Sequence, residues 1–447
     1  MRLWLWFLVA ALPAFVLDAA EQPSQPATTD VKASAQAFIK QLADGRFADA
    51  TGAFDDAVKQ AMPPDKLKAT WESIVADAGA FQGQTGVNEQ EAGQYRVVLV
   101  ECRFERASLE AKVVYTAEGR IGGLWFGPPK PVYQFGPPPY ADKGAFSEKD
   151  VTVGEGEWAL PGTLSLPNGK GPFPAVVLVQ GSGPQDRDET VAANKPFRDL
   201  AWGLASRGVA VLRYVKRTEL YAAKMAAEKP HLTVKEEVVD DAAAAVALLR
   251  KTEGIDGRRV FVLGHSLGGM LVPRIAAAAP DAAGFIVMAG ATRSLSDAVE
   301  DQLDYVTSLA GDQLTDQQKA GLDKMHKEAE EARALKPEDA SSNKVLLGAP
   351  ASYWLDLRDY HPAEAAKAIT RPMLIIQGGR DYQVTARDFD AFKQALAGRA
   401  NVTFKLYPNL NHLFVAGEGK STPAEYETPG HVDAQAVEDV AAWVAAH

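Results

Sequence analysis

The feature that most constrains the fold is a regular alternation of short apolar runs with helical stretches, which begins after Val151. The clearest helical stretch extends from Thr233 to Leu249, where Thr233 and Glu236 have the spacing of a capping box. The apolar runs lie at residues 175–179, 209–212, 260–263, 285–288, 373–376 and 402–406. Strands that are apolar on both faces are typical of a parallel sheet covered by helices on each side. We therefore predict an α/β domain over residues 151–447.

The alternation stops between residues 292 and 370, a stretch far longer than the usual connection of a few residues. Helical spacing recurs inside it at 303–309, 314–322 and 328–335. An insertion at the carboxyl edge of a parallel sheet is well placed to cover an active site. The sequence thus predicts a helical lid insertion over residues 292–370.

Residues 28–127 have a different pattern, which predicts a small α+β domain in front of the sheet domain. Helical stretches come first, and runs with strand-like alternation follow at 95–103, 108–116 and 121–126. The next segment, 128–150, contains clusters of proline and glycine, and we interpret it as a stiff linker. A chain of 447 residues is long enough for two such domains.

Residues 1–20 have the layout of a secretory signal peptide. Arg2 precedes an apolar run, and Ala19 and Ala20 follow it. We therefore expect a secreted or periplasmic protein with no stable membrane insertion after the signal is cleaved. An uncleaved membrane anchor is the alternative, because the start is weakly basic and Asp18 lies near the expected cleavage point.

Charge and composition exclude several classes of function. A net charge of -11 argues against nucleic acid as the main partner, because phosphate binding needs a basic face. Cys102 is the single cysteine, so the chain cannot form an internal disulfide, and we expect a small buried side chain there. Neither metal-ligand spacing nor a G-x-G-x-x-G motif is found, so we predict no metal and no cofactor. The oligomeric state stays open.

The sharpest chemical signal is Gly264-His265-Ser266-Leu267-Gly268, between the strand at 260–263 and a helical stretch. A G-x-S-x-G motif in this context is the nucleophile elbow, where only very small flanking residues let strand and helix approach closely. A chance glycine turn would explain the pattern alone but not its context. Ser266 is therefore the predicted nucleophile.

A serine hydroxyl needs a base beside it to become a nucleophile. His412 follows the strand at 402–406, and Asp381 follows the strand at 373–376. Both side chains should therefore emerge at the same carboxyl edge as Ser266, in the chain order serine, aspartate, histidine. We predict that His412 is the general base and that Asp381 orients it.

Acyl transfer also needs donors directed at the developing oxyanion. We predict that the backbone N–H of Leu267 is one donor, since this residue follows the nucleophile. The N–H of Ser182 is the other, from the glycine-rich loop after the strand at 175–179, with Gly181 as the small neighbour.

With these motifs the chain resembles secreted bacterial α/β-hydrolases, which are esterases or serine aminopeptidase-like enzymes with an N-terminal domain of unknown function. The stretches that carry this resemblance lie at 181–188, 213–218, 264–269, 380–384 and 410–414. The resemblance implies an α/β-hydrolase sheet. The chain departs from the pattern at Gln180, where such proteins often have histidine, and at Val215, where they often have aspartate.

Arg213, Lys216 and Arg217 follow a strand at the predicted catalytic edge. They would suit an anionic substrate group, or they pair with Asp186 and Asp188, which we favour because the pairing would hold the loop that carries Ser182.

Three aromatic residues, Tyr353, Trp354 and Tyr382, are candidates for lining an acyl or aryl pocket, although ordinary packing explains each equally well. The sequence leads to a serine hydrolase that cleaves small-molecule carboxylic esters through an acyl-enzyme intermediate. The alternatives are a serine peptidase or aminopeptidase-like amide hydrolase, and a non-catalytic binding protein of the cell envelope.

Overall fold

The computed structural model describes residues 30–92, 95–127, 133–311, 314 and 316–447. These residues form two units, which divide after Val132. The expected signal peptide at 1–20 lies outside the described residues. In the part of the chain that is described, no helix has both the length and the apolar character needed to cross a membrane.

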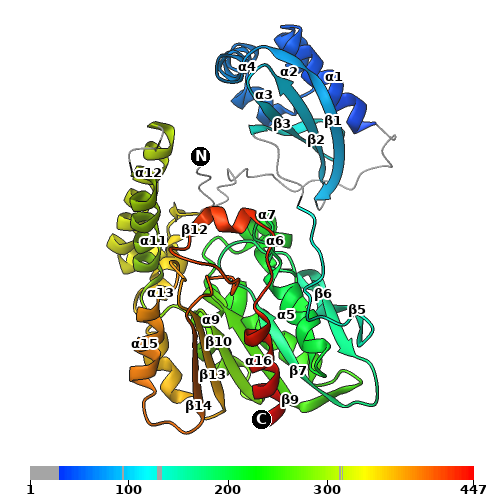
Figure 1. The fold of residues 1–447 in the computed structure, drawn as a ribbon. Coiled ribbons are helices and arrows are strands. Elements are labelled where there is room, and N and C mark those ends of the chain that lie inside the picture. The colour runs from blue at the N-terminus through cyan, green and yellow to red at the C-terminus, as the bar shows by residue number, and fades with distance from the viewer. Residues whose placement is uncertain (1–29, 93–94, 128–132, 312–313, 315) are drawn as a thin grey trace. The chain divides into compact units, whose positions relative to one another are not determined.

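The N-terminal unit has four helices followed by an antiparallel sheet in the order β1-β2-β3-β4 (Figure 1). Its elements are α1 (Val31–Ala43), α2 (Phe47–Thr51), α3 (Asp56–Ala61), α4 (Pro64–Ala78), β1 (Phe81–Ala92), β2 (Tyr95–Phe104), β3 (Ser108–Tyr115) and β4 (Ile121–Gly127). This order confirms the predicted α+β module.

One face of this small sheet packs against α1 and α4. Val98, Val100, Cys102 and Phe104 alternate along β2 and are buried among the apolar residues of these helices, which include Trp71. Cys102 is fully buried, as predicted, and burial raises the pKa of its thiol to about 12. A thiol that stays protonated at neutral pH is a packing group and a poor nucleophile.

The larger unit is built on an eight-stranded sheet in the order β14-β13-β10-β9-β7-β8-β6-β5. Its strands are β5 (Phe146–Val153), β6 (Leu160–Pro167), β7 (Phe173–Val179), β8 (Ala210–Tyr214), β9 (Ile255–His265), β10 (Gly284–Met288), β13 (Met373–Gly378) and β14 (Val402–Tyr407). The pairs β5–β6 and β6–β8 are antiparallel, and every other pair is parallel. Five of the six predicted apolar runs lie wholly within strands of this sheet, and the run at 209–212 begins one residue before β8.

The predicted linker at 128–150 extends too far. Strand β5 begins at Phe146 and pairs antiparallel with β6, from Phe146 opposite Pro167 to Val153 opposite Leu160. It is an edge strand in which only its two end residues are buried, so its sequence is mostly charged and polar. An exposed edge strand has no apolar run, and this is why the pattern resembled a linker.

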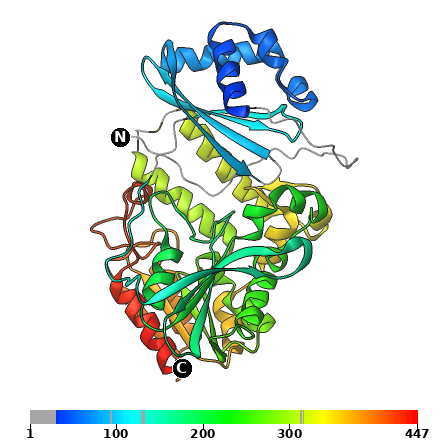
Figure 2. The same cartoon turned by 90° about the vertical axis from the view of Figure 1, so that its right-hand side faces the viewer.

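Both faces of the large sheet are covered, because successive side chains of a strand point to opposite faces. Val176 and Leu178 of β7 belong to one apolar core, and Val177 and Val179 belong to the other. The covering helices are α5 (Pro196–Ala205) and α16 (Ala434–Ala446) on the first face, and α8 (Asp240–Leu249), α10 (Val272–Ala278) and α15 (Ala386–Ala395) on the second. Figure 2 shows α16, in red, along one side of this unit.

The remaining helices of this unit include α6 (Arg217–Leu220), α7 (Ala222–Glu228) and a π-helical turn (Lys235–Val239) that leads into α8. At the start of this turn the N–H of Thr233 donates to Glu236 at 2.8 Å, and the N–H of Lys235 donates to the Thr233 hydroxyl at 3.2 Å. The residues of the predicted capping box therefore do hydrogen-bond to each other.

The insertion at 292–370 is mostly helical. Its elements are α11 (Leu295–Ala310), α12 (Asp316–Ala334), β11 (Val345–Leu346), β12 (Ala349–Pro350), α13 (Ala351–Arg358) and α14 (Pro362–Ala365). The predicted helices at 314–322 and 328–335 are parts of the single long α12, which packs on α11 (Figure 1). Val306 of α11 packs with Tyr382 and Leu413, which lie in the loops after β13 and β14.

Candidate active site

Ser266 occupies a strained turn between β9 and the short helix α9 (Leu267–Met270). Its φ of 53° and ψ of −115° lie in a region that side-chain-bearing residues rarely adopt. A Cβ at Gly264 would lie 2.2 Å from the Gly268 carbonyl oxygen, and one at Gly268 would lie 2.4 Å from that of Val179. Both glycines are therefore sterically required, and the turn has the geometry of a nucleophile elbow.

The predicted base and its orienting carboxylate are brought together. His412 Nδ1 lies 2.7 Å from Asp381 Oδ2, and both side chains are almost fully buried. Asp381 Oδ1 accepts the backbone N–H groups of Gln383 at 2.8 Å and Val384 at 2.9 Å, and Oδ2 also accepts from Gln377 Nε2 at 3.1 Å. A carboxylate surrounded by donors holds the Nδ1–H tautomer of His412, which leaves Nε2 as the basic nitrogen.

Ser266 lies close to Gly181 of the predicted oxyanion loop, and its neighbour His265 lies close to His412. A Cβ at Gly181 would be 3.0 Å from Ser266 Cβ and 3.5 Å from its hydroxyl oxygen. The ring centroid of its neighbour His265 is 4.7 Å from that of His412. Among the described residues the Ser266 hydroxyl has no hydrogen-bond partner, so the structure joins Asp381 to His412 directly and places Ser266 at the predicted oxyanion loop. Hydrogen bonds to the nucleophile are often formed only when substrate is bound.

The residues of both predicted oxyanion donors lie next to Ser266. Leu267 opens α9, and the N–H of a first helical residue has no acceptor within the helix. Ser182 follows Gly181, whose carbonyl accepts from Lys216 Nζ at 2.8 Å and whose N–H donates to Glu189 Oε1 at 2.6 Å. Gly181 is therefore held on both sides. Gln180, at one of the two departures from the family pattern, donates through Nε2 to the carbonyl of Tyr214.

The three cationic residues, Arg213 within β8 and Lys216 and Arg217 just after it, are all paired within the protein. Arg213 pairs with Asp188 and Glu148, Lys216 with Glu237 at 2.9 Å, and Arg217 with Asp241. These cationic residues therefore bind carboxylates of the protein itself, the interpretation that we favoured over an anionic substrate group. Asp188 is one of the partners, as expected. Asp186 instead accepts from the Thr190 hydroxyl at 2.6 Å.

The three aromatic candidates have different surroundings. Tyr382 stacks on Tyr305 of α11, with centroids 4.9 Å apart and planes 10° apart, next to the loop of His412. The Tyr353 hydroxyl donates to Glu237 at 2.8 Å, and Trp354 donates to the carbonyl of Leu346 at 2.9 Å. The structure therefore places Tyr382 beside the loop of His412, while Tyr353 and Trp354 each donate a hydrogen bond to another group of the protein.

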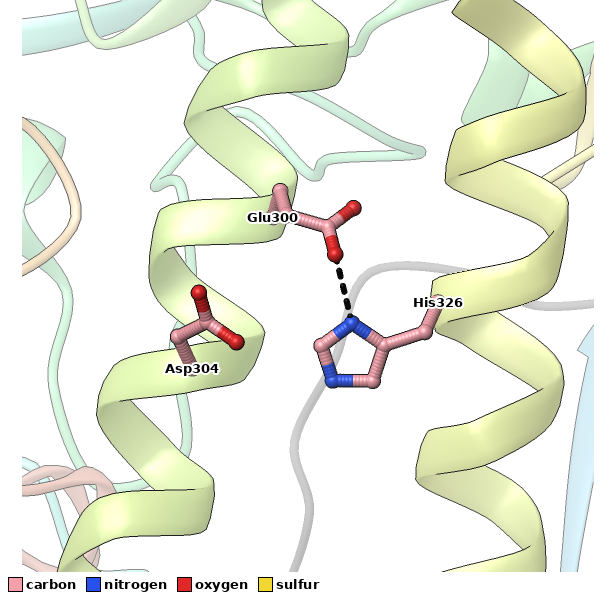
Figure 3. Close-up of side chains that lie close together, drawn as sticks. All are labelled: Glu300, Asp304 and His326. Carbon is pink, nitrogen blue, oxygen red and sulfur yellow. Dashed lines mark hydrogen bonds and ion pairs between the residues drawn. The ribbon is translucent and has the colours of Figure 1, made fainter.

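One cluster outside this site has the residue types of a metal centre. Figure 3 shows Glu300 and Asp304 of α11 facing His326 of α12, with their ligand atoms within 4.8 Å of one another. One oxygen of Glu300 is 2.8 Å from His326 Nδ1, however, and the other is 3.1 Å from Arg333. Because an arginine already neutralises this carboxylate, we interpret the cluster as ion pairs between α11 and α12.

Comparisons with known proteins identify the family of the chain. Residues 196–419 match a family model described as serine aminopeptidase, S33, and residues 35–124 match one described as a protein of unknown function (DUF3887). The chain is 40% identical over 408 residues to esterase EstD of Thermotoga maritima, a match that covers 91% of this chain and 93% of EstD.

Similar solved structures include a hyperthermophilic esterase from Pyrobaculum calidifontis, with 16% identity, a TM-score of 0.42 and coverage of 67% of this chain and 85% of that one. Another is Est1E from Butyrivibrio proteoclasticus, with 16% identity, a TM-score of 0.41 and coverage of 67% and 99%. The family match contains the elbow, the Asp381–His412 pair and the helical insertion, and the second match lies in the N-terminal unit. The chain therefore belongs to the serine aminopeptidase S33 family of α/β-hydrolases, and it carries an N-terminal domain of the DUF3887 type.

Proposed function

We propose that this protein is a serine hydrolase that cleaves carboxylic esters of small molecules through an acyl-enzyme intermediate. The observation that carries the proposal is the buried hydrogen bond between Asp381 and His412, at the sheet edge where Ser266 stands in a strained elbow. The 40% identity to a protein named esterase supports the choice of ester over other acyl substrates.

In the proposed mechanism His412 Nε2 takes the hydroxyl proton of Ser266 as the serine oxygen attacks the ester carbonyl carbon. The negative charge that develops on the carbonyl oxygen is stabilised by the N–H groups of Ser182 and Leu267. The intermediate expels the alcohol, which takes the proton from His412. Water then attacks the acyl-enzyme with His412 again as base, and the carboxylic acid is released with Ser266 restored.

The helical insertion lies beside the proposed site. Its helix α11 packs through Val306 against Leu413 and through Tyr305 against Tyr382, so it lies next to the loops of both His412 and Asp381. We propose that this insertion acts as the lid of the site. An ester series from acetate to octanoate reports how deep the pocket beneath it is.

Amide hydrolysis is the second candidate, favoured by the family description as serine aminopeptidase. The same constellation of serine, histidine and aspartate cleaves both esters and amides. One preparation assayed on p-nitrophenyl esters and on aminoacyl p-nitroanilides separates the two. We expect a much higher kcat/KM for the esters.

The test of the mechanism is Ser266→Ala. We expect it to abolish p-nitrophenol release from the butyrate ester and labelling by a fluorophosphonate probe, because both need the serine oxygen. Ser147→Ala, at an exposed position of the edge strand β5, is the matched control and should keep full activity. Undiminished turnover by Ser266→Ala would refute the assignment, and absence of labelling in the wild type would favour a non-catalytic binding protein.

We also propose that residues 1–20 direct export as a cleaved signal peptide, which the apolar run after Arg2 and the small residues at 19 and 20 support. N-terminal sequencing of the exported protein should then begin near residue 21. A mature protein that retains Met1 would indicate an anchor instead.

A further inference from the structure

A second carboxylate–imidazole pair lies behind the proposed triad. Glu189 and His265 are both almost fully buried, and His265 Nδ1 is 2.9 Å from Glu189 Oε2. His265 Nε2 is 2.9 Å from the backbone carbonyl oxygen of His412. The other oxygen of Glu189 accepts the N–H of Gly181 at 2.6 Å. Groups of Gly181, Glu189, His265 and His412 thus form one continuous hydrogen-bonded chain.

The acceptors around His265 fix where its protons are. A backbone carbonyl can only accept, so Nε2 must carry a hydrogen. Nδ1 faces a carboxylate oxygen, and one further proton must lie between them. Burial lowers the pKa of His265, but the charge of Glu189 and the hydrogen bonds to Glu189 and to the His412 carbonyl outweigh burial and raise that pKa above its ordinary value. With acceptors facing both nitrogens, His265 would donate from both as an imidazolium, whereas His412 has to keep one nitrogen free as a base.

This pair connects every part of the proposed machinery. Gly181 precedes Ser182 of the oxyanion loop, His265 precedes the nucleophile, and the carbonyl that His265 holds belongs to the general base itself. Glu189 adopts a φ of 51°, which is unfavourable for a residue with a side chain and persists only where the surroundings impose it. Lys216 holds the other side of Gly181, because its Nζ donates to the Gly181 carbonyl.

We propose that Glu189 and the protonated ring of His265 are positioning residues, which set the oxyanion loop and the backbone of His412 relative to Ser266. The inference rests on the proposed roles of Ser266 and His412. Neither residue touches the reacting atoms. They act through hydrogen bonds that hold other groups in place, and misplacement by about 1 Å in an active site costs on the order of 100-fold in rate.

The decisive variants are Glu189→Met and Glu189→Gln, which have similar volumes. Methionine leaves the N–H of Gly181 and the ring of His265 without an acceptor, so we expect kcat to fall at least about tenfold while KM changes less than about threefold. Glutamine can accept from Gly181 and donate to a neutral His265 that still donates to the His412 carbonyl. It should keep kcat within about threefold of the wild type.

Asp199 provides the matched control, because it is a buried carboxylate with the same kinds of partner outside the site. Its Oδ2 lies 3.1 Å from His431 Nδ1 and accepts the backbone N–H of Val432 at 3.0 Å. Asp199→Leu should keep kcat within about twofold, whatever its effect on thermal stability. If Glu189→Met fails to fold, His265→Phe replaces it, since phenylalanine retains ring volume without donors and should show the same loss of kcat.

A direct measurement on the wild type completes the test. Nitrogen-15 NMR of histidine-labelled protein should show both ring nitrogens of His265 protonated at pH 8, and one of them unprotonated in Glu189→Gln. A singly protonated wild-type His265, a Glu189→Met enzyme with unchanged kcat, or a Glu189→Gln enzyme as impaired as Glu189→Met would each overturn the proposal. Failure of the proposed function is distinguishable, because Ser266→Ala would then remain active.

Discussion

At the scale of single residues, backbone strain coincides with the proposed chemistry. Six described residues other than glycine have a positive φ, and three of them are Ser266, Glu189 and Phe414, the last of which lies two positions after His412. Such conformations cost about 1–3 kcal/mol each and persist where the surroundings impose them. The strain at these three residues therefore lies in the three loops that the proposed mechanism requires to be fixed.

Asp381→Asn nearly preserves the volume of the side chain, so it tests whether Asp381 orients His412. In Asp381→Asn, Oδ1 can still accept the N–H groups of Gln383 and Val384, but the amide nitrogen then faces two donors, His412 Nδ1 and Gln377 Nε2. His412 is pushed to the tautomer with hydrogen on Nε2, which cannot act as a base. We expect kcat to fall about 10³–10⁴-fold with little change in KM, as measured by steady-state kinetics at pH 8. A loss smaller than tenfold would show that Asp381 does not orient the base.

At the scale of elements, burial decides what the sequence reveals. Central strands such as β10, where every residue is buried, have unbroken apolar sequences and were predicted correctly. Strands β1 and β5 lie at sheet edges and are rich in polar residues, so no alternation marked them. Helix α12 was predicted as two pieces, because residues 323–327 between them are mostly charged and show little apolar periodicity.

The residues of the candidate site also differ in how far the sequence reveals them. Ser266, Asp381 and His412 were found from the sequence because each follows a strand whose apolar pattern is strong, so the fold class alone brings them to one edge. Glu189 has no such signal. Its partner His265 is 76 positions away, and their pairing depends on the path of the oxyanion loop, which no periodicity encodes. The only hint was an acidic residue closely following the glycine-rich turn.

At the scale of the whole molecule, buried charges in the larger unit determine how stability depends on pH. Burial raises the pKa values of Asp188 and Glu148, but the charge of Arg213 and the hydrogen bonds that each carboxylate accepts together outweigh burial and hold both pKa values below their ordinary values. Groups with lowered folded pKa values stabilise the fold above their unfolded pKa, and this contribution is lost as pH falls through the folded pKa. We therefore expect acid to destabilise the fold in part through this network, because both carboxylates take up protons at a higher pH in the unfolded state than in the folded state.

Asp199 should make stability depend on pH in the opposite direction. Burial raises its pKa to about 7 from an ordinary 3.8, while burial and the charge of Arg198 lower the pKa of its partner His431, so the two do not form an ion pair at neutral pH. Between these pH values the folded state keeps a proton that the unfolded state has released, so stability falls as pH rises from about 4 to 7. An uncharged asparagine side chain at this position would carry no such cost. Asp199→Asn should thus gain stability over the wild type as pH rises, by up to about 4 kcal/mol above pH 7 and little near pH 4. Urea unfolding at pH 4.5, 6 and 8 measures this, and a difference between the two proteins that does not change with pH would show that Asp199 is ionised throughout.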